Sequence, residues 1–345
     1  MKLLINTIIC NNKYPPLYKA FIESLVFAIA KDCEGTNIIM LCEAQYNNII
    51  GDIKVNVITL SLHQRLFKKK IYKKRVQAIL NKEQPDVIWH VDVDMIGFYT
   101  TSCCFLWSSH LEISIKKGHQ LLHSSAMSNI LTDDEKIQQQ FLHSEKIKYW
   151  LAPPHQAFRR LTWEQKMQIC ETYTHGHAYF HLCAEQLPES AIVACLKAFS
   201  TFKQWQQSQM KLVITAKKIA HQLYTLLQTY KFKQDVLLLP YTSIDDLATI
   251  TTASYATLYL ASTDFLGWYT KSCAAAKVLT ITDRVVALHS NAVFTCVWNH
   301  ASLSKAMITL YKDEQLQQKI NAAQALWLSH PLREINDANL IIIED

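Results

Sequence analysis

Short apolar runs recur along the second half of this chain, separated by segments whose apolar residues follow helical spacing. Five runs stand out: Tyr179–Cys183, Leu212–Thr215, Val236–Leu239, Ala256–Leu260 and Val278–Thr282. Nearly continuous apolar runs of this length are typical of strands that are buried on both faces of a parallel sheet. The second half is therefore predicted to be a parallel sheet with helices between its strands.

The first half shows the same alternation with weaker signals. Its predicted strands are Lys2–Cys10, Asn37–Cys42, Val55–Thr59, Asp86–His90, Phe105–Trp107 and Ile130–Leu131, and its predicted helices are Ala20–Ala30, Gln64–Asn81 and Asp133–Phe141. Pro153, Pro154 and the polar stretch that follows mark a boundary. The pattern predicts an α/β protein of two domains, 1–150 and 179–330, joined by a linker at 151–178 and followed by a C-terminal segment, 331–345.

Composition agrees with two globular domains. The chain has 345 residues, half of them hydrophobic and 19% charged, which is too apolar for a disordered protein. Its ten cysteines have no regular spacing, and the N-terminus lacks the pattern of a secretory signal, so reduced thiols in a cytoplasmic protein are expected. No apolar run reaches the ~18 residues of a membrane-spanning helix.

Glycine is scarce, with six residues in the whole chain. Phosphate-binding loops need glycine because their backbone N–H groups must approach the anion closely. Neither a Gly-x-Gly-x-x-Gly motif nor a P-loop is present, and the loop after the first predicted strand carries Pro15 and Pro16 instead. These features disfavour ATPases, kinases and dinucleotide-dependent dehydrogenases.

Several segments of the second half carry a family resemblance. They are Tyr179–Phe180, Leu196–Ser200, Met210–Thr215, Tyr230–Val236, Ala253–Ala256 and Ser262–Gly267. This set resembles the nucleotide-sugar-binding domain of GT-B glycosyltransferases, in the retaining group that builds surface polysaccharides. The resemblance implies two Rossmann-like domains facing each other across a cleft, with the acceptor on the first, and a C-terminal segment packing back toward the first domain. It also implies transfer of a hexose from a nucleoside diphosphate sugar to a glycan or lipid-linked acceptor, without cofactor or metal.

Two positions depart from that family. An Arg-Lys-Asn-like triplet usually holds the donor diphosphate, and here Glu189, Ser190 and Ala191 stand in its place. A glutamate that usually holds donor hydroxyls is replaced by Ser272. The alternative interpretation is therefore a catalytically degenerate homologue that acts as a scaffold or partner of an active transferase.

The resemblance also names candidate site residues. On the donor side they are Tyr241, which would lie near the base, together with Ser262, Gly267, Trp268, Ser272, Lys217 and Lys218. The two lysines would replace the lost cations, although edge lysines are the more usual outcome. On the acceptor side His110 is a weak catalytic candidate, because the family's His-Asp pair reads Ser109-His110-Leu111 here. Asp92 and Asp94 have the spacing of a metal motif, but two acids at a strand end are the simpler interpretation.

A dense basic run lies in the first half. It comprises Lys68, Lys69, Lys70, Lys73, Lys74 and Arg75. A solvated helix face and an anionic membrane surface both fit this run. Nucleic acid is disfavoured, because the net charge of +6 is modest and no nucleic-acid-binding motif accompanies the patch.

Overall fold

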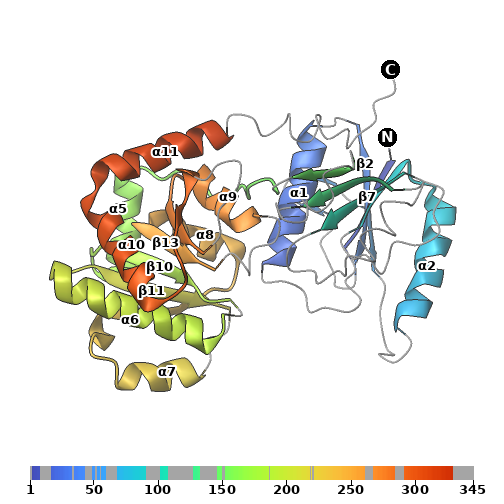
Figure 1. Ribbon diagram of the computed structural model, residues 1–345. Coiled ribbons are helices and arrows are strands. Elements are labelled where there is room, and N and C mark those ends of the chain that lie inside the picture. Colours follow the sequence, from blue (N-terminus) through green and yellow to red (C-terminus); the bar gives the residue numbers. More distant parts are fainter. Residues whose placement is uncertain are drawn as a thin grey trace. The chain divides into compact units, whose positions relative to one another are not determined.

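The computed structural model of the chain describes residues 2–7, 17–32, 35–42, 49–50, 53–54, 56–59, 68–90, 102–107, 127–132, 146–149, 152–185, 187–217, 219, 221–260, 267–283 and 291–328. These residues form two compact units, and the division between them falls after Pro153. Each unit is built on its own parallel sheet with helices on both faces (Figure 1). The α/β class and the two Rossmann-like units are thus as the sequence predicts.

The first unit contains a seven-stranded parallel sheet in the order β5-β2-β1-β6-β7-β8-β9. Its strands are β1 (Lys2–Asn6), β2 (Asn37–Cys42), β5 (Asn56–Thr59), β6 (Val87–His90), β7 (Ser102–Trp107), β8 (Met127–Thr132) and β9 (Ile147–Tyr149). Helices α1 (Tyr18–Asp32) and α2 (Lys68–Glu83) cover opposite faces of this sheet (Figure 1). A short antiparallel hairpin, β3 (Ile49–Ile50) with β4 (Ile53–Lys54), stands apart from it.

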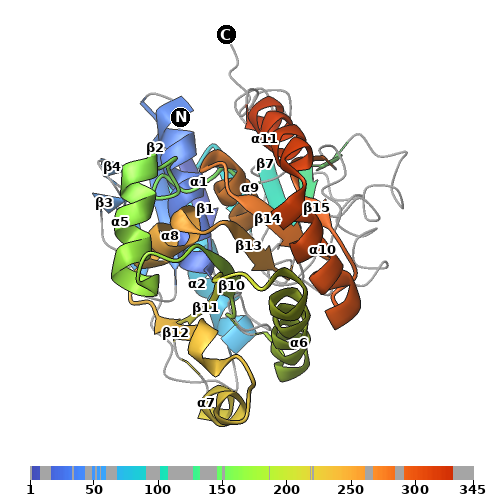
Figure 2. The ribbon, with the colours of Figure 1, turned by 90° about the vertical axis from the view of Figure 1, so that its left-hand side faces the viewer.

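The second unit contains a six-stranded parallel sheet in the order β12-β11-β10-β13-β14-β15. Its strands are β10 (Tyr179–Cys183), β11 (Lys211–Ala216), β12 (Val236–Pro240), β13 (Ala256–Tyr259), β14 (Leu279–Thr282) and β15 (Phe294–Thr295). Its helices are α5 (Trp163–Thr174), α6 (Glu189–Gln206), α7 (His221–Gln228), α8 (Ile244–Ala253), α9 (Trp268–Ala275), α10 (His300–Lys312) and α11 (Glu314–Leu328). Helices α6 and α10 pack on one face of the sheet, and α5 and α8 pack on the other (Figure 2).

The boundary between the units differs in detail from the sequence pattern. Residues 163–174 fall within the predicted linker, but the structure places them in α5 of the second unit. Cys170 of α5 is buried with Tyr179 and Val213 of the sheet. The predicted helix Asp133–Phe141 and the C-terminal segment 331–345 lie outside the described residues.

A buried charge network ties α6 to the start of β12. The Lys203 ammonium, whose side chain is 8% exposed, lies 3.0 Å from Asp235 Oδ2, and Lys211 Nζ lies 2.7 Å from the other carboxylate oxygen. Lys203 also donates to the backbone carbonyl of Met210. Hydrogen bonds from the two lysines and their charges lower the pKa of Asp235 despite its partial burial.

We expect Asp235→Asn to lower the free energy of unfolding by about 2 kcal/mol, because it leaves the buried Lys203 ammonium without a counter-charge. Lys203→Met is the matched control and should cost about 1 kcal/mol or less, since Lys211 still pairs with Asp235. Urea denaturation of both variants measures the difference. Equal losses for the two would show that the pair, rather than the isolated cation, determines the cost.

Candidate functional site

The strand order of the second sheet defines where a ligand can bind. From β10 the chain proceeds to β11 and β12 in one direction, and from β13 to β14 and β15 in the other. The carboxyl ends of β10 and β13 therefore flank a topological switch point, the usual ligand-binding place of an open α/β sheet. Helix α6 follows β10 along the chain, and α9 follows β13.

The first turn of α6 carries a carboxylate. Pro188 is the N-cap and makes no side-chain cap hydrogen bond, and Glu189 is the acidic residue of the first turn. Both Glu189 and Ser190 are exposed. A carboxylate already interacts favourably with the positive end of the helix dipole there, so this N-terminus is less favourable for a second anion.

A second acid follows β10. Glu185 Oε1 accepts a hydrogen bond of 2.5 Å from the backbone N–H of Lys217, the residue after β11. Tyr241, the residue after β12, is 3% exposed. Burial raises the pKa of its phenol, and neighbouring Cys183 and Glu185 raise it further. The ring of Tyr241 is therefore covered in this conformation, and a base could stack on it only after its neighbours move.

Helix α9 begins at the switch-point end of β13. Its N-cap, Gly267, has φ 64° and no side-chain cap hydrogen bond. Glycine adopts this left-handed conformation without strain. Gly267 itself therefore contributes no side-chain cap to the N-terminus of α9.

The next residues of α9 point into the second unit. Trp268 is 1% exposed and Ser272 is fully buried. Ser272 Oγ accepts a hydrogen bond of 3.0 Å from the His155 N–H and donates one of 2.8 Å to the Trp268 carbonyl. The rings of His155 and Phe158 contact Trp268 edge-on, with centroids 6.1 and 6.0 Å away. Trp268 and Ser272 thus hold the segment that contains His155 and Phe158, at the start of the second unit, against α9.

Comparisons with known proteins give structural matches alone, because no protein family profile and no curated protein sequence matches the chain. The crystal structure of WaaG, a glycosyltransferase involved in lipopolysaccharide biosynthesis, matches with a TM-score of 0.71 at 8% identity, over 99% of this chain and 100% of that one. Anabaena HepE in complex with UDP and glucose matches with a TM-score of 0.70 at 11% identity, over 99% and 98%. The chain has the GT-B fold.

The GT-B fold alone does not decide the activity. A putative UDP-N-acetylglucosamine 2-epimerase from Listeria monocytogenes also matches, with a TM-score of 0.64 at 10% identity over 97% of each chain. One fold thus carries proteins described as transferases and as epimerases, so the function has to be argued from the site.

Several residues that the sequence suggests as parts of a site lie outside the described residues. They are Ser262, Lys218, His110, Asp92 and Asp94. Within the described part, no group of three His, Cys, Asp or Glu side chains could hold a metal ion. Of the basic run, the exposed side chains of Lys74 and Arg75 are described.

Buried histidines lie in the central strands of both sheets. His181 of β10 is fully buried, and its Nε2 lies 2.8 Å from Thr215 Oγ1 while its Nδ1 lies 3.1 Å from Thr257 Oγ1. In the first unit, Asn6 Nδ2 lies 3.2 Å from His90 Nδ1 at the ends of β1 and β6. Burial lowers the pKa of each histidine to about 3. Both imidazoles are therefore neutral at pH 7.

One buried cation escapes sequence analysis. Lys271 lies in the first turns of α9, directly before Ser272, and is 1% exposed. A buried ammonium requires compensating charge or hydrogen bonds. No sequence pattern predicts its burial, because a lysine within a helix is normally a surface residue.

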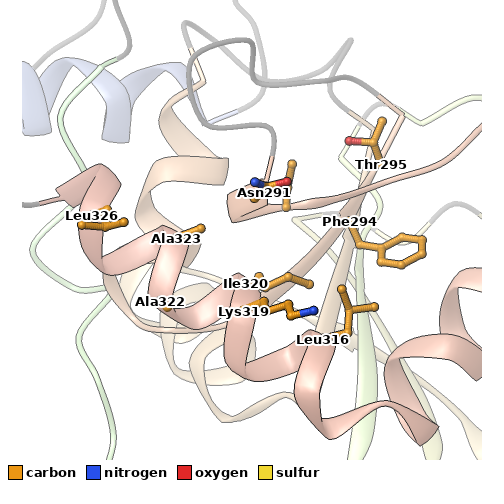
Figure 3. Close-up of a pocket in the computed structure, with 10 residues that line it drawn as sticks. Asn291, Phe294, Thr295, Leu316, Lys319, Ile320, Ala322, Ala323 and Leu326 are labelled. Atoms are coloured by element: carbon orange, nitrogen blue, oxygen red, sulfur yellow. The ribbon is translucent and has the colours of Figure 1, made fainter.

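A cavity of about 480 Å³ lies away from the switch point, between α11 and the edge strand β15 (Figure 3). Leu316, Ile320, Ala323 and Phe294 give it a mainly apolar lining, and Lys319 is its charged residue. It contributes nothing to the strand ends at β10 and β13.

Proposed function

We propose that this chain is a glycosyltransferase that binds a nucleoside diphosphate sugar at the switch point of its second unit and transfers the hexose to a glycan or lipid-linked acceptor on the first. The supporting observation is the strand order of the second sheet, in a chain whose fold is similar over nearly its whole length to a structure that contains UDP and glucose. In such sheets the carboxyl ends of the strands at the switch point meet the ligand.

The residues at this end suggest how the donor would be held. Gly267 gives the N-terminus of α9 no side-chain cap of its own, and the positive end of a helix dipole favours a phosphate. Lys217, directly after β11, is a candidate cation for the diphosphate, together with Lys218. Glu185 would accept hydrogen bonds from ribose or sugar hydroxyls, which carboxylates bind well. Stabilisation of the diphosphate leaving group would come from these dipoles and cations.

A second candidate function is a catalytically degenerate homologue that serves as a scaffold or partner of an active transferase. Glu185 and Glu189 favour it, because both place carboxylates at the end of the sheet where a diphosphate would add negative charge. Loss of one stabiliser of developing charge typically lowers a rate by about 10²–10³. A chain with these substitutions would bind its donor weakly.

Calorimetry against a panel of UDP-, GDP- and ADP-sugars, combined with an assay of sugar release, distinguishes the two candidates. Binding with turnover supports the transferase. Absence of binding across the panel supports the scaffold.

We expect the double variant Glu189→Arg, Ser190→Lys to bind UDP about ten- to a hundredfold more tightly at low salt, because the two substitutions together make the local charge more positive by three units. Calorimetry at two salt concentrations measures it, since screening should reduce the gain. Glu314→Arg is the control, because Glu314 is an exposed acid in the first turn of α11. Unchanged UDP affinity in a folded double variant would mean that the N-terminus of α6 does not meet the donor.

We also propose that the protein is located in the cytoplasm, at the surface of a membrane. A cytoplasmic protein whose α2 lies against an anionic membrane surface would use Lys68, Lys69, Lys70, Lys73, Lys74 and Arg75 for this contact. Lys74 and Arg75 support it, because both side chains are exposed on α2. No helix among the described residues is long and apolar enough to cross a membrane.

A further inference from the structure

Helix α5 carries an apolar stripe that is buried over only half its length. Trp163, Met167, Cys170 and Thr174 follow one another at spacings of three and four, which places them on one helix face. Cys170 and Thr174 are 5% and 1% exposed, whereas Trp163 is 71% and Met167 37% exposed. The stripe therefore continues past the core of the second unit as an exposed aromatic and thioether ridge at the start of α5.

Three cations lie close to this ridge in sequence. Arg159 and Arg160 are exposed, and Lys166 lies one turn after Trp163. The ion pairs of the described residues involve none of these three. Partial burial lowers the pKa of Lys166, and the nearby charge of Arg160 lowers it further. Like charges held close together in this way would be relieved by an external anion.

The acid closest in sequence, Glu164, is ionised and offsets one of these three charges. Glu164 is engaged by its own backbone N–H and by Thr162, and these hydrogen bonds lower the pKa of its carboxyl. It belongs to the capped N-terminus of α5, where Thr162 and Gln165 form a capping box. The start of α5 thus carries three cations and one carboxylate close in sequence to the exposed Trp163, with a net charge of +2.

We propose that this surface, formed by Arg159, Arg160, Trp163, Lys166 and Met167, docks the second unit on an anionic lipid surface. A tryptophan is suited to the boundary between headgroups and acyl chains, because its ring is apolar and its N–H is polar. The guanidinium groups match headgroup phosphates, which they can bind with two hydrogen bonds. The apolar ridge with a cationic rim is the arrangement of segments that lie in a membrane interface.

Another exposed tryptophan shows what sets Trp163 apart. Trp205, in the last turns of α6, is 74% exposed. The neighbouring Lys203 is buried and paired with Asp235, so its charge is not offered to a ligand. Trp205 therefore provides equal aromatic exposure without the cationic rim, and it is the matched control.

This docking surface goes beyond the proposed function, since it needs neither nucleotide binding nor turnover, and it is separate from α2. The test is sedimentation of the whole chain with vesicles of phosphatidylcholine alone or mixed with an equal amount of phosphatidylglycerol. We expect binding to the mixed vesicles, weakened about thirtyfold by Arg159→Gln with Arg160→Gln, because each interfacial cation contributes about a factor of five. Trp163→Ala should also weaken binding, and Trp205→Ala should leave it unchanged.

Lipids brominated on their acyl chains add a measurement of depth, because bromine quenches only tryptophans that reach the acyl region. Quenching should disappear in Trp163→Phe and persist in Trp205→Phe. The four substituted side chains are exposed, so the thermal unfolding midpoints of the variants should equal that of the parent chain. These side chains are Arg159, Arg160, Trp163 and Trp205. Equal binding to neutral vesicles, or binding that depends on Lys74 and Arg75 while the α5 variants have no effect, would overturn the proposal.

Discussion

Replacing Ser272 with glutamate is expected to lower the free energy of unfolding of the second unit by about 3–5 kcal/mol, the cost of an uncompensated buried charge. The substitution restores the residue of the family motif, but the side chain at this position is fully buried. Its hydroxyl is committed to the His155 N–H and the Trp268 carbonyl. A carboxylate accepts only, so it would also lose the bond to that carbonyl.

Ser272→Ala separates the effect of charge from the loss of hydrogen bonds. It should cost about 1–2 kcal/mol, because it leaves the His155 N–H buried without an acceptor. Urea denaturation followed by tryptophan fluorescence reports both variants, since Trp268 lies directly against this contact. If Ser272→Glu were as stable as the parent and bound UDP more tightly, α9 would turn this residue toward the donor as the family motif implies.

Acid should destabilise the second unit through His181. The pKa of this imidazole is about 3 in the folded chain because of burial, while an unfolded chain titrates near 6.5. The unfolded state therefore binds the proton more readily. Stability is complete above pH 6.5 and falls as the pH drops toward 3, by about 1.4 kcal/mol per pH unit. At pH 4.5 the expected loss is about 3 kcal/mol.

The measurement is the free energy of unfolding as a function of pH for the parent chain and for His181→Gln. Glutamine can still donate and accept between Thr215 and Thr257 but does not titrate. The variant should show a shallower decline below pH 6.5 than the parent. Parallel curves would assign the acid sensitivity to other groups, among them His90 in the first unit, which is also buried with a pKa of about 3.

Most strands of the two parallel sheets can be predicted from the sequence because they are buried on both faces. Strands buried on both faces are apolar at nearly every position, and β10 and β2 have the bounds that the sequence pattern predicts, although β10 contains His181 and β2 begins at Asn37. Strand β15 has only two residues, Phe294 and Thr295, at the sheet edge. A run that short leaves no pattern, so it could not be predicted.

Helix α5, in contrast, could not be predicted from the pattern of apolar and polar residues. Most of its residues are polar or exposed, and Cys170 and Thr174 are its buried ones. A helix that contributes so little to a core has the composition of a linker, and the sequence pattern accordingly predicts one. The capping box of Thr162 and Gln165 is the local signal that identifies the start of α5.

The sequence predicts that Trp268 and Ser272 belong to a helix that follows a strand, but it does not predict that their side chains are buried. A motif position locates Trp268 and Ser272 at the start of a helix after a strand, near the switch point. It does not say which face of that helix turns inward. That is decided by His155, which lies 117 residues away from Ser272 in sequence, and by Phe158. Contacts of such separation leave no local trace in the pattern of apolar and polar residues.

The contact of His155 and Phe158 with α9 determines where the chain can be cut to give a separate second unit. The strand that opens the second sheet begins only at Tyr179, so a cut placed there would seem natural. Such a cut would remove α5 and would uncover Trp268, one of the largest fully buried side chains. A self-sufficient second half must therefore begin ahead of His155, and the stretch between the prolines and the first strand is a structural part of it.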